Sequence, residues 1–540
     1  MTSSLTATAS AAPVLDFEQV MAHLGDGLAR QAPEKVSRWV RRMASVGTCV
    51  RPIRLQGSTV TRDAYGRVLS RFSSADEPDG VLLKACGDRR ASRCEGCAYT
   101  YRGDAWQLIA SGLRGGKGVP ESAAAHPRVF LTVTAPSFGP VHTQRVSATG
   151  LRRRCQNRRK DQVCAHGRPV RCLARHADDD ERLGTPICPD CYDHESQVLF
   201  NALAGELWRR TTIYLTRALA DQTGISYRRL HELVRIRHVK VAEYQARGVV
   251  HFHAILRVDA HPTDDQPGPC PPPQWVTGHD LTHAARVAVA KVRVPLPAAA
   301  RTEHRSSFGW GRQVDVHEIT RTPDSDHPDT ETAETAEPGE LSEAKVAAYV
   351  SKYATKSTEA CGGADRPVYS EKAIDYTGAT EHAKALMRTC WHLGGREGLE
   401  HLRLRAWAHT LGFRGHFTTK SHAYSTTFTA LREARHTHAR DHSKPFNVAM
   451  NTAHPGPDRG DRPEPDALDD PDPVGEYDDP YGDADDPEAT TLIINWRYAG
   501  RGYTRPGDAL AAAYLANGPH NKPPATITPS AGPAAAPAPA

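Results

Sequence analysis

Two histidines separated by a single residue interrupt an otherwise apolar segment. Residues 249–256 are apolar except for His251 and His253. Such a run predicts a buried β-strand, and side chains two residues apart on a strand point to the same face. Two imidazoles on one face of a rigid strand can supply half of a divalent-metal site. The alternative is a pair of core histidines, because short His-x-His matches are common.

A carboxylate lies on a second predicted strand, just before the histidines. Residues 239–244 have the composition of a strand, and a turn at residues 245–248 follows them. The two strands are close enough in sequence to form an antiparallel hairpin. Glu243 would then lie beside the imidazoles as an oxygen ligand. The alternative is a strand residue that faces solvent.

Two tyrosines lie one helical turn apart in residues 342–357, which predict a helix. Tyr349 and Tyr353 share one helical face with Lys352 and Lys356, while valines and alanines lie opposite. A phenol is a poor nucleophile at neutral pH because its pKa is about 10. Nearby ammonium groups favour the phenolate, and a metal on a phosphodiester makes the phosphorus easier to attack. The alternative is a basic surface helix with two half-buried tyrosines.

Most of the twelve cysteines fall in one part of the chain, between residues 86 and 191. They are Cys86, Cys94, Cys97, Cys155, Cys164, Cys172, Cys188 and Cys191. Two pairs form Cys-x-x-Cys knuckles, which aim two thiolates at one ion, so the set predicts two four-thiolate structural zinc sites. Either the two knuckles pair with each other, or Cys86, Cys94 and Cys97 stay together with a distant fourth ligand. Free reduced thiols are the alternative, and a redox dithiol is disfavoured because no thioredoxin-like pattern surrounds either knuckle.

The elements around these residues are predicted from their hydrophobic patterns. Residues 128–136 read as a strand, residues 195–222 and 280–292 as helices, and residues 313–319 as a half-buried strand. The cysteine-containing segment 152–195, which also holds a strongly basic run, then looks like an insertion between the first strand and the first helix.

Composition and charge limit the class of protein. The chain has 540 residues and a formal net charge of +5, with basic clusters in the middle and acidic runs at residues 321–340 and 456–488. This segregation is typical of a polyanion-binding body with acidic, solvated segments. No apolar run reaches the ~18 residues of a transmembrane helix, and the N-terminus does not resemble a secretory signal. We therefore expect a cytoplasmic protein with no membrane partner.

Three segments, taken in order, resemble the three motifs of the HUH endonucleases that start rolling-circle replication. They are residues 130–134, the pair His251 and His253, and residues 349–356. The last resembles the Tyr-x-x-Lys-Tyr-x-x-Lys pattern of phage-type initiators. More closely, residues 84–425 resemble the replication initiators of actinobacterial plasmids and integrative elements, known as the RepSA type. Four further segments also match this type, at residues 116–122, 135–142, 205–212 and 412–417.

The resemblance implies an α+β fold with a compact antiparallel sheet and flanking helices, as in HUH endonucleases. Its central strands would carry His251 and His253, which would bind Mg²⁺ or Mn²⁺ together with Glu243. Tyr353 occupies the position of the nucleophile in single-tyrosine relatives. Tyr349 stands where some plasmid initiators have a glutamate that activates water.

The implied activity is site-specific nicking of one strand at a double-strand origin. Tyr353 would form a 5′-phosphotyrosyl link and release a 3′-hydroxyl that primes rolling-circle synthesis. Lys352 and Lys356 would stabilise charge on the phosphate, and Tyr349 or water would resolve the second step. The implied partners are origin DNA, the displaced single strand, and a host helicase and polymerase.

The expected regions follow from these motifs and from composition. They are a partly helical N-terminal region 1–83, a first cysteine-knuckle region 84–127, an HUH endonuclease domain 128–425 that includes the insertion 152–195 and the acidic linker 321–340, a basic and then acidic disordered linker 426–490, and a short ordered element with an Ala/Pro tail 491–540.

Two other readings of the same residues remain. One is a relaxase or transposase with the same HUH chemistry, although a relaxase would more often carry its tyrosine before a histidine triad. The other is a non-enzymatic zinc-containing DNA-binding regulator in which the histidines are purely structural.

Overall fold

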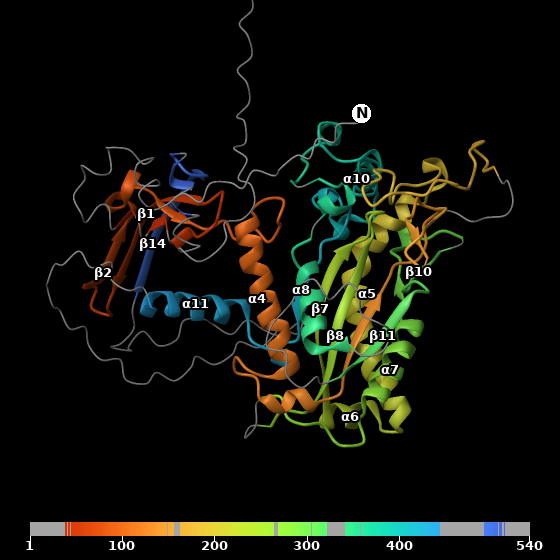
Figure 1. Cartoon of the computed structure of the whole chain (residues 1–540), viewed down its shortest axis with the longest axis horizontal. Helices are drawn as coiled ribbons and strands as arrows, with labels where there is room; N and C mark the ends of the chain where they lie inside the picture. Colours follow the sequence, from red (N-terminus) through yellow and green to blue (C-terminus); the bar gives the residue numbers. More distant parts are fainter. Residues whose placement is uncertain are drawn as a thin grey trace, which may run out of the picture. The chain divides into compact units, whose positions relative to one another are not determined.

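Figure 1 presents the chain as a computed structural model. The structure describes residues 38–512 except 40, 41, 44, 148, 156–162, 264–267, 304, 321–340, 357, 365, 443–490, 506, 510 and 511. The acidic linker 321–340, most of the linker 426–490 and the Ala/Pro tail therefore lie outside the described residues. The chain divides into two compact units, of which unit 1 comprises residues 1–99 and 442–540 and unit 2 comprises residues 100–441.

Unit 2 is built on a six-stranded sheet with the order β12-β11-β4-β8-β7-β13. Its strands are β4 (Arg128–Val133), β7 (Val234–Tyr244), β8 (Val250–Ala260), β11 (Val314–Thr320), β12 (Leu341–Ser342) and β13 (Thr418–Lys420). All neighbours are antiparallel except β11 and β12. The predicted α+β class with antiparallel sheets is confirmed.

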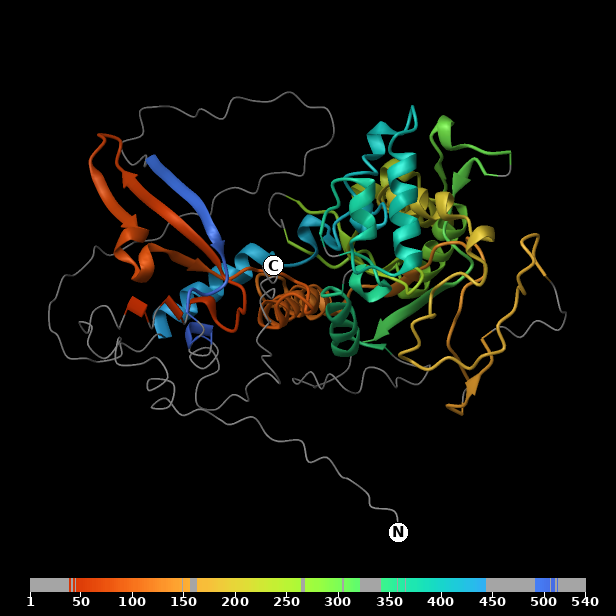
Figure 2. The same ribbon diagram turned by 90° about the horizontal axis from the view of Figure 1, so that it is seen from above.

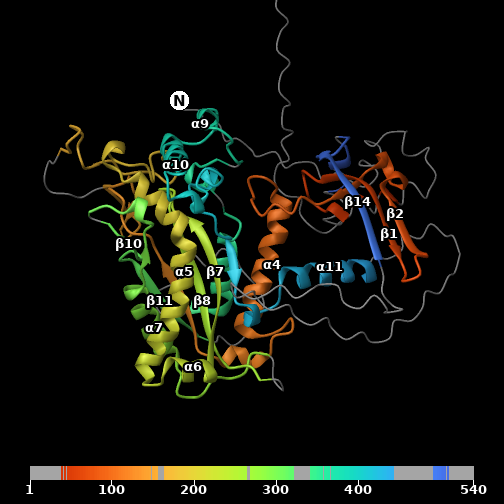
Figure 3. The same ribbon diagram turned by 180° about the vertical axis from the view of Figure 1, so that it is seen from behind.

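Helices cover both faces of this sheet (Figures 1 and 3). The unit contains α4 (Glu95–Arg114, whose first residues belong to unit 1), α5 (His194–Thr223), α6 (Tyr227–Leu233), α7 (Gly278–Lys291), α8 (Glu343–Tyr353), α9 (Glu371–Asp375), α10 (Glu381–Leu393) and α11 (Phe428–His442). α5 and α7 pack on one face, and α10 packs on α5. α8 and the second half of α4 pack on the other face.

The alternation of side chains along β8 explains how two cores share one sheet. Phe252, Ala254 and Leu256 point to the core under α5 and α7, and all are fully buried. Ile255 points to the opposite core, under α4 and α8. The predicted two-residue period therefore puts both histidines on the α8 face.

The segment between β4 and α5 contains little regular structure. It includes the two-residue strands β5 (Arg145–Val146) and β6 (Arg152–Arg153), which pair with each other. Figure 2 draws it in orange and yellow, mostly as loops at the edge of unit 2. A second short pair, β9 (Val294–Pro295) and β10 (Ser307–Phe308), follows α7.

Unit 1 is a smaller antiparallel sheet assembled from distant parts of the sequence. Its strands are β1 (Ile53–Arg62), β2 (Val68–Ser73), β3 (Leu82–Lys84) and β14 (Thr491–Arg501). β14 pairs with β1 along its whole length, and β2 and β3 also pair with β1. The short ordered element expected near residue 492 is thus a strand of the same sheet as the N-terminal region. Among the described residues, no helix combines the length and the apolar character needed to cross a lipid bilayer.

Candidate active site

The hairpin β7–β8 brings three potential metal ligands together. Glu243 stands directly opposite His251 in the register, and His253 is one step further along the same face. Glu243 Oε2 lies 3.0 Å from His251 Nε2 and 3.3 Å from His253 Nε2. The turn closes at Gly248, whose positive φ of 76° suits glycine.

The electrostatics of this group favour a bound cation. Burial raises the pKa of Glu243, but hydrogen bonds to His251, His253 and Lys356 outweigh it and lower the pKa to about 2. Burial lowers the pKa of His253, which favours its neutral form. The Nε2 atoms of both histidines lie within hydrogen-bond distance of one Glu243 carboxylate oxygen, so each can donate a proton to it or, once that proton is lost, turn the same lone pair to a metal ion at this point.

The surroundings of His253 also fit a metal ligand. Its Nδ1 lies 3.1 Å from the hydroxyl of Thr132 on the adjacent strand β4. A hydrogen bond at Nδ1 leaves the Nε2 lone pair free for coordination, as outer-shell partners do in known metal sites. Two imidazoles and one carboxylate would hold a divalent ion such as Mn²⁺ or Mg²⁺ and leave positions open for a substrate.

Helix α8 lies over this group because its apolar side packs on the sheet. Ser342 caps the helix by accepting a hydrogen bond from the backbone N–H of Lys345. Val346 and Val350 are buried in the core beneath it. Glu343 forms an ion pair with the buried Arg128 of β4, which ties the first turn to the sheet.

This packing brings both tyrosines to the histidines. The ring of Tyr353 stacks on His253 with centroids 5.1 Å apart, and the ring of Tyr349 meets His253 edge-on at 5.3 Å. The two phenol rings are 4.6 Å apart. Burial raises the pKa of Tyr349, which makes its phenolate harder to form.

The two lysines of the motif take different positions. The sequence predicts a helix to residue 357, but α8 ends at Tyr353, and the Lys356 N–H bonds to the Tyr353 carbonyl in a tight turn. Lys356 Nζ therefore reaches back to the sheet, 2.8 Å from Glu243 Oε1 and 4.2 Å from the centroid of the Tyr353 ring. Lys352 is exposed on the helix surface.

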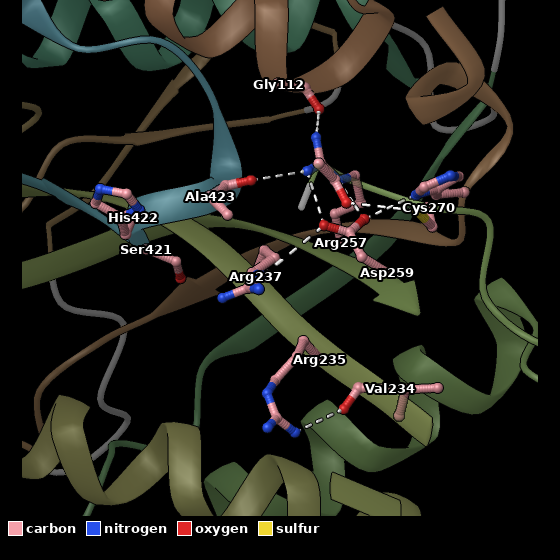
Figure 4. A network of polar contacts seen from close by, with 12 residues as sticks. Gly112, Val234, Arg235, Arg237, Arg257, Asp259, Cys270, Ser421, His422 and Ala423 are labelled. Carbon is pink, nitrogen blue, oxygen red and sulfur yellow. Dashed lines mark hydrogen bonds and ion pairs between the residues drawn. The ribbon is translucent and has the colours of Figure 1, made fainter. Parts of the chain in front are cut away.

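A buried polar network lies further along the same face of β8 (Figure 4). Arg257 is fully buried and donates to Asp259, to the Gly112 carbonyl of α4 and to the Ala423 carbonyl. His126 Nδ1 lies 2.7 Å from Asp259 Oδ1. This network fixes α4 and the segment after β13 to the strand that carries the histidines. Our sequence reasoning missed it, although the two-residue period from His251 to Asp259 could have indicated it.

The cysteines of unit 1 form a four-thiol group. Cys86, Cys94 and Cys97 are joined by Cys49, and their sulfur atoms all lie within 4.8 Å of one another. Cys86 and Cys97 are 3.6 Å apart, and Cys94 and Cys49 are 3.9 Å apart. The sequence analysis did not identify the distant fourth ligand of Cys86, Cys94 and Cys97, and in the structure Cys49 takes that position.

The other five of the eight predicted cysteine ligands belong to two mixed groups within unit 2. One contains Cys164, His166, Cys188 and Cys191, and the other contains His142, Cys155, Cys172 and His176. Each of these groups, like that of unit 1, could hold a metal ion.

This partition differs from the two expected four-thiolate sites. The two knuckles do not join each other, because each belongs to a different group. Sequence reasoning missed Cys49, His142, His166 and His176 as partners of the cysteines, since it counted thiols and set imidazoles aside. The group that contains Cys155 and Cys172 begins at His142, which lies ten residues before residue 152, the expected start of the insertion.

Comparison with known proteins supplies the context for this geometry. Residues 35–517 match the family model RepSA, described as "Replication initiator protein, pSAM2". A replication initiator protein of Streptomyces ambofaciens is 37% identical over 500 residues, which cover 91% of this chain and 92% of that protein. No solved structure matches the chain.

Proposed function

This chain belongs to the RepSA family of replication initiators, and from that premise we propose that it initiates rolling-circle replication by nicking one strand of an origin with a tyrosine nucleophile. The substrate is the double-strand origin, and the products are a 5′-phosphotyrosyl link and a free 3′-hydroxyl. The same HUH chemistry would use the metal group of β7 and β8 and the tyrosines of α8.

One observation carries the proposal. The Tyr353 ring stacks on His253 at 5.1 Å, and Lys356 bridges from that ring to Glu243. A nucleophile, a cationic side chain and a potential metal ligand set thus meet on one face of the sheet, although they come from segments far apart in the sequence. A purely structural role for the histidines would not require two phenols beside them.

The chemical step assigns a role to each side chain. The phenolic oxygen of Tyr353 attacks the scissile phosphorus in line, and its proton passes to solvent. A bond forms between this oxygen and phosphorus, the bond from phosphorus to the 3′-oxygen breaks, and the leaving oxygen takes up a proton to become the 3′-hydroxyl. Lys356 stabilises the negative charge that develops on the phosphate oxygens.

The metal group and the second tyrosine complete the mechanism. A divalent ion held by His251, His253 and Glu243 would polarise the phosphodiester. Glu243 stays ionised across the working pH range because its pKa is lowered to about 2. Burial raises the pKa of Tyr349, so its phenolate is harder to form, and either Tyr349 or water would resolve the second step.

Replacement of Tyr353 by phenylalanine tests this function. Tyr353→Phe keeps the ring that stacks on His253 and removes only the nucleophilic oxygen. We expect origin binding to stay within about twofold and nicking of supercoiled origin plasmid in Mn²⁺ to fall by at least ~10³-fold. The covalent protein–DNA adduct should disappear from a denaturing gel.

Tyr376→Phe is the matched control, because Tyr376 is 90% exposed and lies outside the candidate site. It should nick and form the adduct like the wild type. Nicking by Tyr353→Phe at the wild-type rate, with Tyr349 intact, would contradict the assignment of the nucleophile.

A further inference from the structure

We propose that the segment between β4 and α5 is a two-zinc module, in which His142, Cys155, Cys172 and His176 bind one zinc ion and Cys164, His166, Cys188 and Cys191 bind another. The two centres share no ligand. The inference rests on the geometry of this segment and is independent of nicking.

The geometry of the first group is that of a collapsed tetrahedral site. His142 Nδ1 lies 3.2 Å from His176 Nε2, and Cys172 Sγ lies 3.5 Å from the same His176 nitrogen. All four ligand atoms are within 4.8 Å of one another. Two thiolates and two imidazoles are a common zinc set, and ligands on a tetrahedral zinc are separated by comparable distances.

An outer-shell carboxylate supports the assignment independently. His176 is buried, and its second ring nitrogen, Nδ1, lies 2.7 Å from Asp180 Oδ2. Asp180 is itself held by Arg182 at 2.8 Å. A carboxylate on the distal nitrogen fixes the tautomer that presents Nε2 to a metal, which is the usual arrangement of a zinc-bound histidine.

Backbone contacts hold the ligands of this centre in place. The Thr143 N–H donates to Cys155 Sγ at 3.2 Å, as amides do to zinc-bound thiolates. The His142 N–H bonds to the Thr185 carbonyl, so the centre joins distant parts of the module. His142 and Cys155 also flank the short strand pair β5–β6, so this centre closes the base of that basic hairpin.

The second centre has the form of two facing knuckles. Cys164 Sγ lies 3.7 Å from Cys188 Sγ, and His166 Nδ1 lies 3.2 Å from Cys191 Sγ. The Gly167 N–H returns to the Cys164 carbonyl in a tight turn with a positive φ of 72°. This turn orients a thiol and an imidazole towards one point.

Phe138 and Tyr192, at the two ends of the module, pack in the core of unit 2, but the described residues between them form no apolar core of their own. Among its described residues between 140 and 191, the buried ones are Cys155, His176, Gly184, Pro186 and Cys188, and three of these five are proposed ligands. Valine and leucine side chains such as Leu151 and Val163 are exposed. A segment with so little buried apolar surface needs cross-links, and zinc binding supplies such folding free energy.

Metal counting on the full-length chain tests the proposal. Native mass spectrometry after saturation with Zn²⁺ should give one zinc fewer than the wild type for the double variant His142→Ala/His176→Ala. Cys164→Ser/Cys191→Ser should also lose one zinc, and the two pairs combined should lose two. An unchanged count in the histidine variant, or loss of two ions from it, would overturn the two separate centres.

A milder variant keeps the test informative if the ligand variants fold poorly. Asp180→Asn leaves all eight ligands in place and should raise the Kd of one zinc ion about 10- to 100-fold in a chelator competition, with the full count at saturation. Cys270→Ser and His401→Ala, which lie outside all the groups, should change neither count nor affinity. Unchanged affinity in Asp180→Asn would contradict zinc binding at His176.

Discussion

At the scale of single residues, the buried His253 and the half-buried His238 are not equivalent. His253 faces a carboxylate and a phenol, whereas His238 on β7 points to the opposite face of the sheet, towards α5. Trp208 Nε1 donates to His238 Nε2, and His238 Nδ1 lies 3.0 Å from the Ser421 hydroxyl. Protonation of Nε2 would set two donors against each other, so this site selects the neutral imidazole.

The environment of His238 predicts a pH dependence of stability. Burial, with a smaller effect of Lys240, lowers the pKa of His238 from 6.5 to about 4. The unfolded chain therefore takes up this proton near pH 6.5 and the folded chain only near pH 4, so stability is full above 6.5 and falls as the pH drops between these values. By pH 5.5 we expect a loss of about 1 kcal/mol from this residue, since one pKa unit corresponds to about 1.4 kcal/mol.

Urea unfolding of unit 2 at pH 7.5 and 5.5 measures this loss. His238→Gln should be less stable than the wild type at pH 7.5 but should lose about 1 kcal/mol less between the two pH values. The exposed His401→Ala should follow the wild type. An equal loss in wild type and His238→Gln would contradict a neutral His238 in the folded chain.

Site residues that lie close together in the sequence could be predicted from local patterns, whereas ligands far apart in the sequence could not. Glu243 and the two histidines lie within a hairpin, so strand periodicity alone placed them on one face. Cys49 lies 37 residues before Cys86, and nothing in the spacing of the knuckles points to it. His142 was also missed, because a histidine has many roles and only the fold reveals which one it takes.

At the scale of elements, the position of α8 decides whether its two tyrosines lie beside Glu243, His251 and His253. The first turn of α8 is tied to β4 by the ion pair of Glu343 with Arg128, whose side chain is 3% exposed. Arg128 also donates to the Leu113 carbonyl of α4 at 2.5 Å. The ion pair is remote from the phenol oxygens, so Glu343 is a positioning residue.

Glu343→Gln should therefore slow nicking indirectly, because α8 and its tyrosines would shift relative to the sheet. Loss of the charge leaves Arg128 buried with an incomplete partner, which should lower the free energy of unfolding by about 1–3 kcal/mol. A small displacement of the helix should lower the nicking rate by roughly 10- to 100-fold while origin binding is kept. Single-turnover nicking and urea unfolding measure the two effects.

The double variant Arg128→Met/Glu343→Leu provides the decisive comparison. It replaces both charges by apolar side chains, which can restore stability and helix position. Recovery of part of the nicking rate would support a positioning role. The exposed Glu397→Gln should nick normally. A wild-type rate in Glu343→Gln would show that the ion pair does not set the position of α8.

The boundaries of the elements were less predictable than their existence. The sequence pattern of α8 continues to residue 357, but the structure ends the helix at Tyr353 and turns Lys356 towards Glu243. Helical periodicity cannot foresee this, because the competing contact lies on a strand more than a hundred residues earlier. The expected insertion at residues 152–195 stays a prediction, and one of the cysteine–histidine groups extends beyond it to His142.

At the scale of the whole molecule, unit 1 is held together by strands from opposite ends of the chain. β1 pairs with β14 over residues 53–62 and 491–501. The Tyr503 hydroxyl also donates to the Cys49 carbonyl at 2.8 Å, and Ala512 packs in the same core as Cys94. Single-sequence reasoning expected two separate regions here, because the pairing of distant strands leaves no local signal. The C-terminal strand therefore stabilises the surroundings of the four-thiol group.

Gly57 is the position at which this long-range pairing can be broken by one substitution. Its φ is +148°, and a Cβ there would lie 1.8 Å from the Asn495 carbonyl oxygen on β14. Gly57→Val should separate β1 from β14 and speed amide hydrogen exchange at least ~10-fold in residues 53–62 and 491–501. Peptides from β7 and β8 in unit 2 should exchange as in the wild type.

Gly66→Asn is the matched control, because Gly66 has open space around it and asparagine tolerates its positive φ. Wild-type exchange in Gly57→Val would mean that β14 does not hold this sheet together.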